Sequence, residues 1–187
     1  MKDVARILLF IGYMWVLADG YLGPIYALYS EKIGGDVLDT AGAWAVFMVV
    51  SGLLHLVFGR LADKPHRAKR VMLLGYLLAT FGSVGYIFIT NMFGLFIVQI
   101  VLGTANAMSS STFDGIYSRS INKNNAVKMW SYIEGGYAII TAIGSVIGGL
   151  IVTLFSWTFL FVVMAATNAV ATGIIFFIQD VQQQEWN

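Results

Sequence analysis

Six apolar segments, each of about 20 residues, constrain this chain more than any other feature of its sequence. A helix rises about 1.5 Å per residue, so a segment of this length can cross the ~30 Å hydrocarbon core of a bilayer. The segments cover residues 7–29, 41–58, 71–89, 92–113, 129–155 and 157–178. We therefore predict an all-α membrane protein whose residues 1–187 form a single bundle of six transmembrane helices.

The composition agrees with this prediction and excludes several functions. Only 11% of the residues are charged and 58% are hydrophobic, whereas soluble domains are about 25% charged. A net charge of +1 is too small to neutralise many phosphates, so nucleic acid is not an expected partner. With no cysteine and only two histidines, we expect no metal site and no cofactor.

Positive charges predict the orientation of the bundle. Of the 11 Lys and Arg residues, all except Lys32 lie beside segment ends on one side of the membrane, and both termini lie on that side. Because Lys and Arg accumulate in cytoplasmic loops, we expect both the N and C termini in the cytoplasm. The protein is then a multi-pass protein of the plasma membrane, surrounded by lipids.

The six segments also divide into two triplets. Three is an odd number, so the second triplet would begin on the opposite side of the membrane from the first. This arrangement predicts two inverted three-helix repeats, which are common in secondary transporters and place binding sites between the repeats.

An acidic residue, Asp19, lies deep inside the first segment. A lone carboxylate in hydrocarbon is costly unless it is paired, hydrated or protonated. Gly20, Gly23 and Pro24 follow it and should weaken the helix. A carboxylate beside a helix break is suited to bind a proton or a cation, and Tyr26 is placed to line the same cavity. The alternative is a neutral Asp19 hydrogen-bonded to a neighbouring helix.

The fourth segment carries a polar stripe at helical spacing: Gln99, Gly103, Asn106, Ser110 and Asp114. Polar side chains avoid lipid, so this face should contact protein or a water-filled cavity. Gln99 and Asn106 are therefore candidate substrate or ion-coupling residues. The alternative is that the stripe only forms hydrogen bonds between helices.

The fifth segment contributes Glu134 and a run of small residues. Glu134 is a further ion-coupling candidate, unless it reaches the cytoplasmic interface. Gly144, Gly148 and Gly149 are spaced so that helices can approach closely, and we interpret them as a helix-packing motif.

The loop after the second segment reads Gly-Arg-Leu-Ala-Asp-Lys-Pro-His-Arg-Ala-Lys-Arg from Gly59 to Arg70. By composition alone it could be a basic anchor for lipid phosphates. The loop resembles the signature between helices 2 and 3 of the major facilitator superfamily, with His66 and Ala68 departing from the pattern. The resemblance implies a cytoplasmic gating network made by Gly59, Asp63, Arg67 and Asp114.

Two other segments are similar to motifs of the same family. The run from Gly144 to Gly149 is similar to the Gly-Pro-x-x-Gly-Gly motif of the drug/proton antiporter branch, with Ser145 in place of Pro. Gln99 and Gly103 match the Arg-x-x-x-Gly pattern of the fourth helix, with Gln in place of Arg.

The family resemblance covers the whole chain and matches the N-terminal six-helix half of these transporters. It implies a proton-coupled secondary transporter, an antiporter of a small solute, that works by alternating access between two bundles. The other bundle would come from a homodimer or a separate half, or the chain is the N-terminal part of a 12-helix transporter. A structural or assembly role stays open. An enzyme is not expected, because a rhomboid-like protease would need a Gly-x-Ser-x-Gly nucleophile and a deeply placed His.

Overall fold

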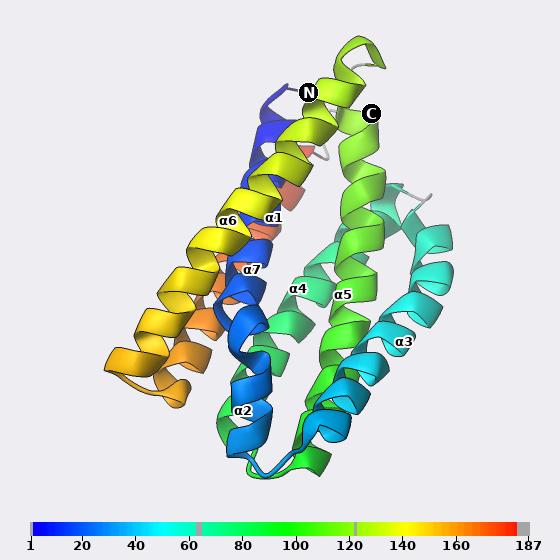
Figure 1. Cartoon of the computed structure of the whole chain (residues 1–187). Coiled ribbons are helices and arrows are strands. Elements are labelled where there is room, and N and C mark those ends of the chain that lie inside the picture. Colours follow the sequence, from blue (N-terminus) through cyan, green and yellow to red (C-terminus); the bar gives the residue numbers. More distant parts are fainter. Residues whose placement is uncertain (1, 63–64, 122, 183–187) are drawn as a thin grey trace.

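The computed structural model describes residues 2–62, 65–121 and 123–182. Within these residues, six helical spans are long and apolar enough to cross a membrane: Ala5–Lys32, Val37–Leu61, Arg67–Phe88, Met92–Ser120, Ala126–Leu154 and Trp157–Phe177. The predicted six-helix bundle is confirmed. Both termini lie at one end of it, as do the α3–α4 and α5–α6 connections (Figure 1).

The spans are built from seven α-helices and three short 3₁₀ turns in the described part of the chain. In order they are α1 (Lys2–Leu22), η1 (Gly23–Ile25), α2 (Tyr26–Lys32), α3 (Val37–Ala62), α4 (Pro65–Gly85), η2 (Tyr86–Phe88), α5 (Met92–Ser120), η3 (Lys123–Asn125), α6 (Ala126–Leu154) and α7 (Trp157–Gln182).

The first span is interrupted where the sequence predicts a weak point. A 3₁₀ turn at Gly23–Ile25 separates α1 from α2. Pro24 has no N–H to donate, so the regular pattern of helical hydrogen bonds cannot pass through it. The break lies one helical turn beyond Asp19, which confirms the expected pairing of a carboxylate with a broken helix.

The second span begins at Val37, earlier than the predicted residue 41. Asp36 and Asp39 cap this end reciprocally: each backbone N–H donates to the other carboxylate, at 3.2 and 2.8 Å. The preceding turn contains Gly34 at a φ of 90°, a conformation that glycine adopts without strain. Acidic residues that look like a loop in the sequence therefore start the helix.

The fourth span runs to Ser120, whereas the segment predicted from the sequence ends at residue 113. The extension is stabilised by burial of Ile116 and Tyr117. The Tyr117 hydroxyl also donates to the carbonyl of Met129 on α6, at 2.9 Å. The polar residues of this stretch misled the prediction, because two of them, Ser118 and Ser120, donate to carbonyls of their own helix.

The helix contacts repeat between the two triplets. The main contacts are α3 with α5, α4 with α5, α1 with α6, α4 with α7 and α1 with α7. Exchanging the first, second and third spans with the fourth, fifth and sixth maps the α1–α6 contact onto α5–α3, and α1–α7 onto α5–α4. Because the second triplet starts at the opposite end from the first (Figure 1), this pattern matches the predicted inverted repeats.

Burial is unequal among the spans. In the spans of α3 and α6, only 11% of the most apolar 18-residue stretch is buried within the bundle. The share is 39% in the spans of α1, α4 and α5, and 50% in that of α7. Two core clusters hold the bundle. One, near the termini, includes Ile11, Tyr76 and Tyr117, and the other, near α2, includes Tyr29, Leu95 and Phe161. Asp19 lies between them along α1.

Candidate functional site

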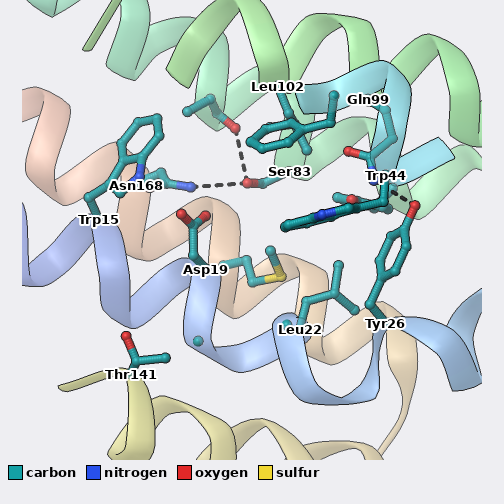
Figure 2. A pocket seen from close by; sticks show the side chains of 16 residues that line it. Trp15, Asp19, Leu22, Tyr26, Trp44, Ser83, Gln99, Leu102, Thr141 and Asn168 are labelled. Atoms are coloured by element: carbon teal, nitrogen blue, oxygen red, sulfur yellow. Dashed lines mark hydrogen bonds between the residues drawn. The ribbon is translucent and has the colours of Figure 1, made fainter. Parts of the chain in front are cut away.

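A cavity of about 260 Å³ opens beside the break in the first span. Residues from all six spans line it. Its walls are mainly aromatic and apolar, including Trp15, Tyr26, Trp44, Phe47 and Tyr86. We call this space the central cavity; Figure 2 shows its lining.

Asp19 supplies the acidic group of the central cavity, and its side chain is exposed there. Trp15, one helical turn earlier on α1, lies beside it (Figure 2). Among the described residues that line the cavity, none is Lys, Arg or His. A carboxyl group at this depth without a lining cation is placed to hold a proton or a positively charged ligand.

A hydrogen-bonded pair lies across the cavity from Asp19. Asn168 of α7 donates from Nδ2 to the Ser83 hydroxyl of α4 at 3.0 Å, and both residues line the cavity. Figure 2 shows the carboxyl group of Asp19 pointing toward this pair. Neither residue was predicted from the sequence. A polar Asn in the middle of an apolar sixth segment was a usable signal, of the kind that identified the stripe in the fourth segment.

Gln99 and Tyr26 meet at the other end of the central cavity. Gln99 donates from Nε2 to the Tyr26 hydroxyl oxygen at 2.6 Å, and both side chains are buried. Tyr26 is the first residue of α2, so this bond ties the segment after the break to α5. Tyr26 also packs against Trp44 of α3, with ring centroids 6.1 Å apart. The structure therefore brings two predicted site residues, Gln99 and Tyr26, into one cavity with Asp19.

A second cavity, of about 380 Å³, lies on the side of Asp19 toward the termini. Trp15 and Asp19 line both cavities and so form the partition between them. The second space, which we call the inner cavity, is also lined by Asn106, Asp114 and Glu134. No Lys, Arg or His occurs among its described lining residues. Three carboxyl groups, those of Asp19, Asp114 and Glu134, thus line one cavity.

The polar stripe of α5 is mostly turned toward α3. Asn106 donates from Nδ2 to the Ser51 hydroxyl at 2.7 Å, and the Ser110 hydroxyl lies 3.2 Å from Nε2 of His55. Gly103 lies against the backbone of Phe47. The stripe contacts protein and cavity, as predicted. Asn106 does both, because it bonds Ser51 and lines the inner cavity.

The glycines of α6 divide between two faces. A Cβ at Gly144 would lie 2.9 Å from the Leu17 carbonyl oxygen, and one at Gly148 would overlap the Tyr21 carbonyl. These two glycines therefore allow α1 and α6 to touch along their backbones. Gly149 faces open space, with nothing within 4 Å of an added Cβ. Including Gly149 in the packing motif was wrong for the contacts within this bundle.

The expected cytoplasmic gating network is only partly visible. Asp63 lies outside the described residues. Arg67 is exposed on α4, and no ion pair joins it to Asp114, which instead lines the inner cavity. Gly59 lies within α3 with no described neighbour near its Cβ position.

Comparison with known proteins identifies the family. The model of the Major Facilitator Superfamily matches residues 8–187. This chain belongs to that family. It is also similar to the "Multi-drug resistance efflux pump PmrA homolog" of Lactococcus lactis subsp. lactis (strain IL1403), with 26% identity over 173 residues. That alignment covers 91% of this chain and 42% of the relative, so the chain spans less than half the length of the relative.

Proposed function

We propose that this bundle forms one wall of a transport pathway for small organic cations, and that Asp19 couples their movement to protons. The observation that carries the proposal is the position of Asp19, whose exposed carboxyl group borders two cavities at once. A group reached from both spaces can take up an ion from one side and release it to the other. Alternating access would then open Asp19 to one of the two cavities at a time.

The central cavity supports a cationic substrate. Its aromatic faces attract a positive charge, and Asp19 can neutralise that charge. At about 260 Å³ the cavity is smaller than the roughly 300–1,000 Å³ that typically holds drug-sized ligands. It therefore suits a small cation, or one side of a larger one. The relative named as a multidrug efflux pump agrees with an organic substrate.

Exchange of a proton for a cation follows from the single carboxyl group of the central cavity. Asp19 binds a cation when it is ionised and cannot do so equally well when it carries a proton. Asp114 and Glu134 extend the acidic lining from Asp19 toward the end with the termini. We propose that this end faces the cytoplasm of a plasma-membrane protein, because the basic residues gather there, and that protons pass through the inner cavity.

A second six-helix bundle completes the pathway in this proposal. It would be a second copy, a separate chain or a further part of the same chain. The support is the low burial of α3 and α6, which expose side chains such as Val49 and Val146. In a complete transporter, α3 and α6 would contact the second bundle through these exposed faces.

Transport in proteoliposomes tests the coupling. The purified protein is reconstituted with an imposed pH gradient, and movement of a fluorescent monovalent organic cation is followed against empty liposomes. We expect movement that reverses direction when the gradient is reversed. Movement that is equal with and without the gradient would show that the proposed coupling is wrong.

Crosslinking tests the second bundle. The chain has no cysteine, so Val49→Cys or Val146→Cys provides a single reactive thiol. In membranes, a bifunctional thiol reagent should join two copies if the partner is a homodimer. Gly173→Cys, on α7 and with no near neighbour at its Cβ, serves as the comparison position. Equal crosslinking at all three positions would exclude a specific α3 or α6 contact between copies.

A further inference from the structure

One residue that lines the central cavity, Asn168, has a buried acceptor without a donor. The Oδ1 atom of Asn168 is buried without a hydrogen-bond partner, in a residue that is only 4% exposed. A buried polar atom left unpaired costs free energy, so the position of this oxygen needs a reason. Asn168 lines the central cavity, and its side chain lies across from Asp19 (Figure 2).

The orientation of the Asn168 amide follows from the bonds around it. The Ser83 hydroxyl has a single proton, and it donates that proton to the Ala79 carbonyl at 2.9 Å. The Ser83 oxygen can then only accept from Asn168, so the NH₂ group must face Ser83. Rotating the amide would place two acceptors against each other. While Ser83 donates to Ala79, Oδ1 is therefore the free end of the amide.

We propose that Asn168 is a specificity-determining residue, whose Oδ1 accepts an N–H from the cationic substrate that Asp19 neutralises. This inference rests on the proposed function of the cavity. The ligand it selects is a protonated amine, which carries both a charge and an N–H donor. A quaternary ammonium ion has the same charge and no donor, so it cannot satisfy Oδ1.

Because Oδ1 is buried, the proposal requires side chains around the cavity to move when a ligand enters. Met164 lies one helical turn before Asn168 on the same face of α7 and also lines the cavity. Methionine has three rotatable bonds and adapts its shape easily, so it can move aside when a ligand enters. The ammonium group would then lie between the Asp19 carboxylate and the Asn168 oxygen.

Binding of two matched probes tests the proposal. Benzyldimethylammonium has one N–H, and benzyltrimethylammonium has a methyl group in its place. Binding to the full chain in lipid nanodiscs is followed by tryptophan fluorescence, since Trp15 and Trp44 line the cavity. We expect the wild-type protein to bind the N–H probe about tenfold more tightly than the quaternary probe. In Asn168→Leu this preference should disappear while the quaternary probe binds as before.

Two further variants complete the test. Thr172→Val removes a hydroxyl that bonds the Asn168 backbone carbonyl and does not line the cavity, so it should keep the tenfold preference. Ser83→Ala releases the NH₂ group and lets the amide turn, so it should lower the preference by roughly two- to threefold. Ser83→Ala carries the test by itself if Asn168→Leu does not fold.

The outcomes separate this inference from the proposed function. If Asn168→Leu keeps the tenfold preference, or lowers the affinity for both probes equally, Asn168 does not recognise the N–H group and the inference is overturned. If neither probe binds the wild-type protein, or Asp19→Asn leaves binding unchanged, the proposed function itself fails.

Discussion

The contact of α1 with α6 and the contact of α5 with α3 occupy equivalent places in the two triplets, yet they are built differently. The α1–α6 contact is a backbone approach through Gly20, Gly144 and Gly148. The α5–α3 contact combines one glycine, Gly103, with side-chain hydrogen bonds such as Asn106 to Ser51.

The difference shows how one arrangement can serve two purposes. In α5 the mid-membrane polar groups are largely satisfied by α3, and they hold helices together. In α1 the glycines make the contact with α6, which leaves Asp19 exposed to the cavities rather than bonded to a neighbouring helix. We infer that α1 carries the ion chemistry and α5 provides the support. Substitutions in the two contacts should therefore have different effects.

Asp19→Asn should have the largest effect. The amide has nearly the same shape but cannot carry a proton or neutralise a cation, so gradient-driven transport in proteoliposomes should fall close to the level of empty liposomes. Asp39→Asn is the matched control, because Asp39 lies at the start of α3 outside both cavities and Asn also caps helices. Full transport in Asp19→Asn would contradict the inference that α1 carries the ion chemistry.

Gly148→Ala should be the most destabilising of the packing changes. The added methyl group overlaps the Tyr21 carbonyl, and a backbone atom cannot move aside as a flexible side chain can. We expect a loss of about 3 kcal/mol, measured as a lower midpoint of thermal unfolding in nanodiscs. Gly149→Ala, on the next residue but facing open space, should leave the midpoint within error. Equal midpoints for both variants would contradict the assigned α1–α6 contact.

Gly103→Ala should destabilise the equivalent contact less. Its methyl group would lie 2.7 Å from the Phe47 carbonyl oxygen, which is also backbone, but the overlap is smaller than at Gly148, so the helices have to separate less. A loss of about 1–2 kcal/mol is expected. The measurement is the same unfolding midpoint, and a loss larger than that of Gly148→Ala would reverse the comparison.

Asn106→Leu should have the smallest effect on stability. It removes the hydrogen bond to Ser51, worth about 0.5–1.5 kcal/mol, and leaves one serine able to find a partner in its own helix. A double-mutant cycle with Ser51→Ala isolates the pair. If Asn106 serves only packing, transport should follow the amount of folded protein. A loss of transport beyond that amount would assign it a role in the inner cavity.

Features governed by local chemistry were predicted well from the sequence. Membrane spans are set by apolar length, and the helix break is set by Pro24, so both could be identified without knowing the neighbouring helices. The depth of Asp19 follows from its position along one span. The family assignment rested on loop residues that lie in a fixed order, and it is confirmed.

Features that depend on which helix lies alongside could not be predicted in the same way. Gly148 and Gly149 are adjacent and identical in sequence terms, but only Gly148 faces α1. The end of α5 depends on burial of Tyr117 against α6, which the polar sequence around it conceals. The free oxygen of Asn168 arises from a bond to Ser83 on a distant segment, so no spacing rule identifies it.

The sparse burial of α3 and α6 also affects how the protein should be handled. Outside a membrane, their apolar ridges will be covered by detergent tails. A detergent that carries a quaternary ammonium group would bring an aromatic-binding cation within reach of Asp19 and act as a competitor for the central cavity. Affinities for small cations should therefore increase when the protein is moved from such a detergent into a lipid bilayer.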